Sequence, residues 1–254
     1  MKKEIPILYS TAMAQAKVAW RKTQTRRIVK FRQKGWRLSF EANEPTRRDL
    51  DAFGVLDKHG NYVETEEGTP GTLRELNLCP YGEVGSILWG RECVNKGENG
   101  NFHYKTDELG PLNEVRWTPS IHMPKEAARI WDEITGIRVE RVADISEEDC
   151  IAEGIEMLYN SKKEYCGFKN YLKEGEDKNT VGFGSPIKSY RSLWQLINGK
   201  PKLKGGQYEV YPFDEQAAAE FAGVTTWKGK PLTVITNPWV WVIESKQLSV
   251  NGKP

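Results

Sequence analysis

One short stretch near the end of the chain, Trp239-Val240-Trp241-Val242-Ile243, limits the possible folds more than any other. If this stretch is a β-strand, its side chains alternate between two faces, and both faces are apolar. A strand with two apolar faces must be covered on both sides. The sequence therefore predicts that this strand is central in a sheet or forms part of a barrel.

Other elements are predicted from the periodicity of their apolar side chains. Met13, Ala16 and Trp20 form one stripe of an amphipathic helix. A second helix is predicted over residues 190–197, where apolar side chains recur at i, i+3, i+4 and i+7. Short strands are predicted near residues 5–9, 87–94 and 134–142. This mixture of helices and strands indicates the α+β class.

Three polar stretches interrupt these elements and are predicted to be insertions. They lie near residues 41–81, 156–187 and 200–235. We expect a hairpin turn at 58–62 in the first and a small helix at 215–221 in the third. The chain of 254 residues then predicts a single domain over 1–248, with a loose tail at 249–254.

Composition disfavours several classes of protein and of site. The chain has no run of about 18 apolar residues, and its N-terminus lacks the apolar region of a secretory signal. We therefore expect a cytoplasmic protein with no membrane partner. The cysteines form no C-x-x-C pair, which predicts reduced thiols rather than disulfides or a zinc site. They are Cys79, Cys93, Cys150 and Cys166. With three histidines in the chain, we expect no His-rich metal centre.

Positive charge is concentrated near the N-terminus, although the chain as a whole is nearly balanced, with 37 basic and 35 acidic residues. No Asp or Glu occurs between Glu4 and Glu41. Residues 20–27 (WRKTQTRR) are the densest part of this basic window. Clustered cations repel one another unless a partner offsets them, so this segment is a candidate site for an anionic or polar group. A solvated, basic helix end is the alternative.

The conformation of this segment has two possibilities. If the preceding helix continues, Lys22 and Thr25 share a face. If the chain becomes extended, Thr23, Thr25 and Arg27 share a face instead. The sequence leaves both open.

A second informative stretch is residues 144–155 (DISEEDCIAEGI). Ser146 is a good N-cap with Asp149 three positions later, and Gly154 is suited to end the helix. Glu153 then lies in the last turn, where a carboxylate opposes the helix dipole. This placement predicts a cationic partner for Glu153, and the basic segment is the obvious source. A solvated surface Glu is the alternative.

At residues 21–27 the chain resembles the signature of the ASCH family, which belongs to the PUA-like superfamily of β-barrels. The signature is written G-x-K-x-x-[E/T]-x-R, and Lys22, Thr25 and Arg27 match its spacing. Trp20 stands where the family has Gly. This difference changes the backbone freedom beside the candidate site.

Four further stretches resemble the family in the same order along the chain. Residues 85–89 (GSILW) are similar to its G-D-x-L strand, with Ser86 for Asp, and residues 145–155 are similar to its capped helix ending in E-G. Residues 190–196 and 237–242 resemble the close of larger members found in bacteriophages and prophages. The resemblance implies a small mixed β-barrel with rim helices and long polar insertions, in the cytoplasm of a bacterial or phage-infected cell.

The resemblance also implies an activity. Some bacterial members are amidohydrolases that remove the acetyl group from N4-acetylcytidine, and they need no metal or cofactor. Matched residue by residue, their catalytic residues are Lys22, Thr25 and Glu153 in this chain, and Arg26 and Arg27 are candidates for binding the substrate, a modified cytidine nucleoside. A Thr hydroxyl becomes a useful nucleophile when a base such as a neutral Lys takes its proton.

Two other functions are compatible with the same resemblance. PUA-like barrels bind RNA, so the chain is alternatively an RNA- or nucleotide-binding module without catalysis, with the basic segment on phosphate. A ribonuclease of the ASCH type is the third possibility. Turnover of an N4-acylcytidine that depends on Lys22 separates the first function from the other two.

Overall fold

The structure is a computed structural model that describes residues 2–39, 49–107, 115–173 and 182–254. Residues 41–48 of the first predicted insertion and 174–181 of the second lie outside the described residues. The chain forms two compact units. Unit 1 comprises Met1–Thr25, Lys30–Val139 and Trp241–Pro254, and unit 2 comprises Arg26–Val29 and Glu140–Val240. A single domain over 1–248 stays a prediction.

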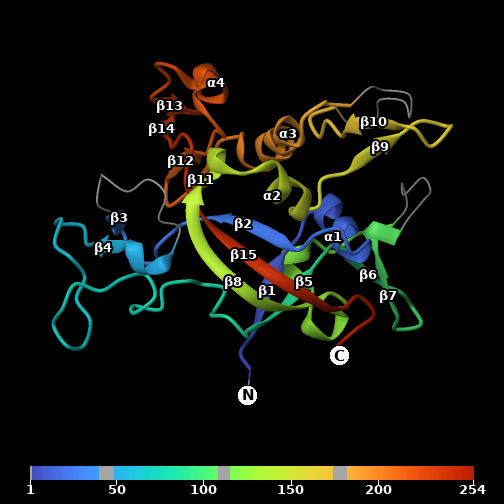
Figure 1. Ribbon diagram of the computed structural model, residues 1–254, viewed down its shortest axis with the longest axis horizontal. Coiled ribbons are helices and arrows are strands. Elements are labelled where there is room, and N and C mark those ends of the chain that lie inside the picture. Colours follow the sequence, from blue (N-terminus) through green and yellow to red (C-terminus); the bar gives the residue numbers. More distant parts are fainter. Residues whose placement is uncertain (1, 40–48, 108–114, 174–181) are drawn as a thin grey trace. The chain divides into compact units, whose positions relative to one another are not determined.

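The main sheet has five strands in the order β1-β5-β8-β15-β2 (Figure 1). They are β1 (Glu4–Leu8), β5 (Ile87–Arg91), β8 (Trp131–Arg141), β15 (Trp239–Ser249) and β2 (Gln24–Ile28). Strand β1 runs parallel to β5, and β5 runs antiparallel to β8. The predicted α+β class is confirmed. The described strands form an open sheet with β1 and β2 at its edges, rather than the closed barrel that the resemblance implies.

The prediction for the last strand is confirmed. β15 lies between β8 and β2, and Val240, Trp241, Val242 and Ile243 are all buried. The strand continues to Ser249, beyond the apolar stretch that predicted it. Its polar second half was not predicted because the backbone pairing of a strand does not require apolar side chains on both faces.

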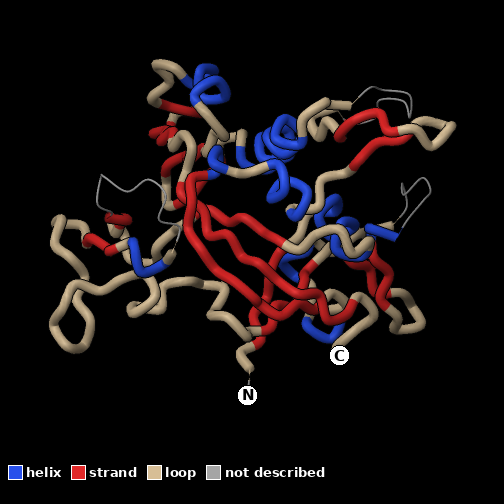
Figure 2. Tube along the Cα trace, in the orientation of Figure 1, coloured by secondary structure: helices blue, strands red, loops and turns tan. Residues whose placement is uncertain are grey.

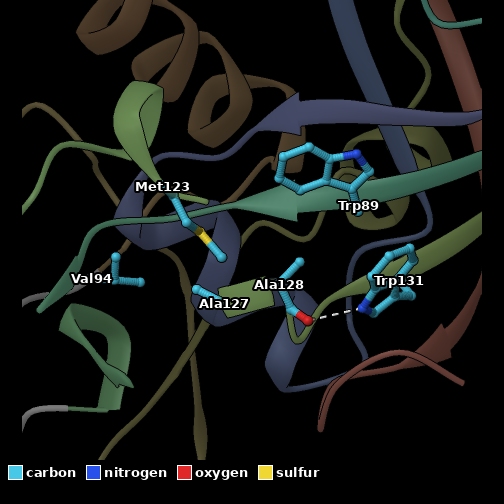
Figure 3. Packing of buried hydrophobic residues seen from close by; sticks show 6 residues of the cluster. All are labelled: Trp89, Val94, Met123, Ala127, Ala128 and Trp131. Atoms are coloured by element: carbon cyan, nitrogen blue, oxygen red, sulfur yellow. Dashed lines mark hydrogen bonds between the residues drawn. The ribbon is translucent and has the colours of Figure 1, made fainter. Parts of the chain in front are cut away.

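One part of the apolar core of unit 1 is formed by two strands and the segment that leads into the second of them (Figure 3). Trp89 comes from β5 and Trp131 from the first residue of β8. The indole nitrogen of Trp131 donates to the carbonyl of Ala128 at 2.9 Å, so the buried polar atom of this side chain is satisfied. Val94, Met123 and Ala127 complete the cluster.

Among its described residues, unit 1 also contains one α-helix and two small pairs of strands. These elements are α1 (Thr11–Val18), β3 (Arg37–Ser39), β4 (Gly54–Leu56), β6 (Val94–Lys96) and β7 (Phe102–Tyr104). β3 pairs with β4 and β6 with β7, both antiparallel. The predicted turn at 58–62 is confirmed, because the Asp57 carboxylate accepts the backbone N–H groups of His59 and Asn61 at 2.8 and 2.9 Å.

Among its described residues, unit 2 contains three α-helices and two small sheets. Figure 2 draws helices in blue and strands in red. The helices are α2 (Glu147–Ala152), α3 (Pro186–Asn198) and α4 (Glu215–Ala218). β9 (Met157–Tyr159) pairs with β10 (Tyr165–Phe168). The other sheet has the order β11-β12-β14-β13. Its strands are β11 (Lys202–Lys204), β12 (Gln207–Val210), β13 (Thr226–Trp227) and β14 (Lys230–Val234).

This four-stranded sheet occupies the third predicted insertion. The small helix expected there is confirmed as α4 with the 3-10 turn that follows it. The sheet was not predicted, although it buries an apolar cluster of its own, Val210, Phe221 and Leu232. Its strands are between two and five residues long and mix polar with apolar residues, so their periodicity is too weak to distinguish them from loops.

Candidate functional site

The candidate site begins where α1 ends. The backbone N–H of Trp20 donates to the carbonyl of Lys17 at 2.8 Å, and that of Arg21 donates to the carbonyl of Ala16 at 2.9 Å. This pair of hydrogen bonds is a Schellman motif, which needs a left-handed residue after the helix. Trp20 has a φ of 57°, a conformation that favours glycine. The Gly of the resembled signature therefore has a physical reason at this position, and Trp20 adopts the same backbone at a conformational cost.

Beyond Trp20 the segment becomes extended, which decides between the two conformations left open by the sequence. Residues Gln24–Ile28 form β2, so Thr25 and Arg27 face one way along the strand and Arg26 faces the other. Lys22, Thr25 and Arg26 have exposed fractions of 1%, 2% and 3%. Lysine and arginine are rarely so buried unless they are paired. The alternative of a solvated, basic helix end is therefore wrong.

The second predicted stretch forms α2, as expected. The Ser146 hydroxyl caps the helix by accepting the backbone N–H of Asp149 at 3.1 Å. Gly154 ends it with a φ of 84°, a left-handed conformation suited to glycine. Glu153 is the C-cap residue, and its exposed fraction is 3%. A solvated Glu153 is therefore excluded, and the predicted cationic partner must be found among its neighbours.

That partner is Arg26, so the prediction of a partner from the basic segment is confirmed. Nη1 of Arg26 donates to Oε1 of Glu153 at 3.3 Å. The same guanidinium donates to Glu140 from Nε at 3.0 Å and to Asp149 from Nη2 at 2.7 Å. The Arg26 side chain is completely buried. Burial alone lowers the pKa of Arg26, but the negative charges around it, led by Glu153, raise the pKa overall.

The uncharged neighbours of this guanidinium are held in their neutral forms. The ring of Tyr190, from α3, has its centroid 5.9 Å from the guanidinium carbon of Arg26. Burial raises the pKa of Tyr190 well above its usual value, and it raises that of the Cys150 thiol to about 12. A thiol with such a pKa is a poor nucleophile at neutral pH. Cys150 is therefore a structural residue beside the ionic cluster.

A second buried ionic cluster lies in unit 1, and sequence reasoning missed it. Nζ of Lys17 donates to Oδ1 of Asp132 at 2.9 Å and to Oγ of Ser245 at 3.1 Å. The Tyr9 hydroxyl donates to Oδ2 of Asp132 at 3.3 Å. Both ionic side chains are completely buried. A usable signal existed, because Lys17 stands four residues after Met13 on the buried face of α1.

Asp132 also connects this cluster to a predicted catalytic residue. Burial raises the pKa of the Asp132 carboxyl, although the positive charges of Lys17 and Lys22 act in the opposite direction. The positive charge of Lys22 therefore contributes to the electrostatic environment of Asp132. Lys17 contacts the carboxylate directly.

The five predicted site residues fall in both units. Lys22 and Thr25 belong to unit 1, and Arg26, Arg27 and Glu153 belong to unit 2. The structure brings Arg26 and Glu153 together, and Arg27 donates from Nη1 to the carbonyl of Arg26 at 3.0 Å. The approach of Lys22 and Thr25 to Glu153 stays a prediction, as does binding of a substrate by Arg26 and Arg27.

The described residues contain neither a candidate metal site nor a candidate membrane span. That part of the chain holds no group of three or more His, Cys, Asp and Glu side chains arranged to bind a metal ion. No helix in it is long and apolar enough to cross a membrane. Comparison with protein-family models, with curated proteins and with solved structures gives no match for this chain.

Proposed function

We propose that the protein is an amidohydrolase that removes the acyl group from N4-acylated cytosine nucleosides, with Lys22, Thr25 and Glu153 as its reacting groups. We also propose that its sheet is a variant of the ASCH type of PUA-like fold. The ASCH-like spacing of Lys22, Thr25 and Arg27 supports both proposals.

One observation supports the pairing of the two stretches that the proposal combines. Arg26, which lies within the ASCH-like segment, binds the carboxylate of Glu153 in the interior of unit 2. The resemblance pairs this segment with the E-G helix end, and the two sequences are more than a hundred residues apart. A contact between them supports the pairing. It also shows why Glu153 tolerates the unfavourable end of a helix dipole, because the guanidinium offsets its charge.

The proposed reaction begins with the hydroxyl of Thr25. A neutral Lys22 amine takes the hydroxyl proton while the oxygen attacks the acyl carbonyl carbon. Negative charge then develops on the carbonyl oxygen, and the Arg27 guanidinium or backbone N–H groups are suited to stabilise it. When the C–N4 bond breaks, the proton held by Lys22 passes to N4, which leaves as the amino group of cytidine. Water hydrolyses the acyl-threonine ester to a carboxylate and the free hydroxyl.

Glu153 and Arg26 have different roles in this scheme. The Glu153 carboxylate accepts a hydrogen bond from the exocyclic N4–H of the base, as carboxylates do with cytosine, or orients Lys22. Three donor nitrogens of Arg26 are engaged by Glu140, Asp149 and Glu153. We therefore assign Arg26 to positioning Glu153, and leave Arg27 as the arginine that contacts the substrate.

The test is hydrolysis of N4-acetylcytidine, followed by the loss of its ultraviolet absorbance. We expect turnover by the wild type and at least about a hundredfold loss of kcat/KM in Lys22→Ala, Thr25→Ala and Glu153→Ala. Thr25→Ser is the matched control, because it keeps the hydroxyl and should keep measurable turnover. A folded wild type that hydrolyses neither this compound nor longer N4-acyl analogues would contradict the proposal.

A further inference from the structure

The proposed reaction does not use the buried ion pair of Lys17 and Asp132. We propose that Lys17 and Asp132 are positioning residues that hold the Lys22–Thr25 segment in its reactive arrangement. This inference rests on the proposed function and adds two residues to its machinery. The contacts that support it all lie within unit 1.

The backbone of the segment is fixed at three consecutive residues. The N–H groups of Arg21 and Lys22 both donate to the carbonyl of Ala16, at 2.9 and 3.3 Å. The carbonyl of Thr23 accepts the backbone N–H of Ser245 at 2.8 Å. The segment is therefore tied to the last turn of α1 on one side and to β15 on the other. These two anchors fix the backbone position of Lys22 and the direction of the chain as it reaches Thr25.

Lys17 connects the two anchors. It follows Ala16 in the last turn of α1, and its carbonyl accepts a hydrogen bond from the Gln247 side chain at 3.0 Å. Its ammonium donates to the Ser245 hydroxyl at 3.1 Å, and this hydroxyl in turn reaches the Thr23 carbonyl at 3.5 Å. A side chain at the end of α1 thus contacts the residue of β15 that holds Thr23.

Asp132 keeps the Lys17 ammonium oriented toward Ser245. Its Oδ1 accepts from Lys17 at 2.9 Å, and its Oδ2 accepts from the Tyr9 hydroxyl at 3.3 Å, so the carboxylate is held at both oxygens. The carboxylate comes from β8, a strand of the main sheet, which provides a rigid support. Side chains held in this way fix a reacting group more accurately than a loop alone.

Stability alone does not explain this arrangement. A completely buried ion pair contributes little net stability, because its two charges lose their hydration. Apolar residues of similar shape often give the folded protein equal stability. The retained charges are instead suited to defining one geometry. A shift of a reacting group by about 1 Å is enough to lower a rate about a hundredfold.

The experiment compares two double variants that each remove one ion pair of unit 1, completely buried in the first and partly buried in the control. The first is Lys17→Met with Asp132→Asn, in which Asn still accepts from Tyr9. The control is Arg129→Met with Glu92→Gln, which removes a bidentate pair between the flanks of β5 and β8 and also the contact of Arg129 with the half-exposed Asp107. Urea unfolding, and kcat and KM for N4-acetylcytidine, are measured for both variants and for the wild type.

We expect the Lys17/Asp132 variant to unfold near the wild-type urea concentration but to lose about 10- to 100-fold in kcat, with KM little changed. The control should keep the wild-type kcat. If the Lys17/Asp132 variant keeps its kcat, or if the control loses as much, the inference is overturned while the proposed function stands. If the wild type has no turnover, the proposed function fails and the inference fails with it. Should the double variant not fold, Ser245→Ala, which removes only the connecting hydroxyl, must show the same selective loss of kcat.

Discussion

Each of the two units buries an ionic cluster, and the two clusters differ in their ability to change charge. In unit 2 the Arg26 guanidinium meets the carboxylates of Glu140, Asp149 and Glu153. In unit 1 the Asp132 carboxylate accepts from the Lys17 ammonium and the Tyr9 hydroxyl, and the positive charge of Lys22 also acts on it. Arginine cannot lose its proton in a protein, whereas a buried carboxyl with a raised pKa can take one up.

This difference separates two ways of stabilising buried charge. The unit 2 cluster depends on a permanent cation whose planar fork fits several carboxylates at once. The unit 1 cluster has a carboxyl that can become neutral when its partner is lost. Removing the cation should therefore be more damaging in unit 2 than in unit 1, and the damage in unit 1 should depend on pH.

The largest effect is expected at Arg26. Arg26→Met leaves three carboxylates without their shared guanidinium, and we expect a loss of about 4 kcal/mol in the free energy of unfolding. Urea denaturation measures this loss. The matched control is Arg74→Met, because Arg74 also binds two carboxylates, Asp49 and Asp51, but at the surface. The control should lose less than about 1 kcal/mol, and equal losses in the two variants would break the comparison.

A smaller and pH-dependent effect is expected at Lys17. Because burial raises the pKa of Asp132 above 3.8, its contribution to stability is greatest below pH 3.8 and falls as the pH rises through the raised value. Lys17→Met removes a charge that favours the ionised carboxyl, so this fall becomes larger. We expect a loss of about 3 kcal/mol at neutral pH and a smaller loss in mild acid.

Urea denaturation across this pH range measures the effect of Lys17→Met. The control is Asp132→Asn in the Lys17→Met background, which removes the titrating group and should remove the pH dependence. A loss that is the same in mild acid and at neutral pH would show that Asp132 does not take up a proton when Lys17 is absent.

The smallest effect is expected at Trp20, in the turn between α1 and β2. A left-handed backbone is unfavourable for Trp20 and costs glycine nothing. Trp20→Gly should therefore raise the free energy of unfolding by about 1 kcal/mol. Asn77 has a φ of 46°, and asparagine tolerates this region better. Asn77→Gly should therefore gain less. A destabilised Trp20→Gly variant would mean that contacts of the indole outweigh the backbone strain.

Local signals in the sequence were sufficient for several elements. Ser146 and Gly154 defined α2 by their capping chemistry, and the two apolar faces of Trp239–Ile243 predicted a central strand. The misplaced charge of Glu153 predicted a cationic partner, and the structure supplies one. These signals succeed because each is contained within a few residues of chain.

The features that the sequence did not predict depend on contacts between distant parts of the chain. The sequence alone did not show which cation meets Glu153, because that choice depends on the extended conformation of β2, which turns Arg26 away from the face of Thr25. The pair of Lys17 and Asp132 joins residues 115 positions apart, and no local pattern connects them. The open sheet was missed because strand order and closure are set by long-range pairing.

The most direct test of the proposed activity compares two isosteric changes at carboxylates that accept from the same guanidinium. Glu153→Gln and Asp149→Asn each remove one negative charge beside Arg26. The kcat/KM for N4-acetylcytidine is measured for both variants and the wild type. The proposal predicts a loss of about a hundredfold or more in Glu153→Gln and less than about threefold in Asp149→Asn. Equal losses in both variants, or wild-type turnover in Glu153→Gln, would show that Glu153 belongs to a structural ion cluster and has no part in the reaction.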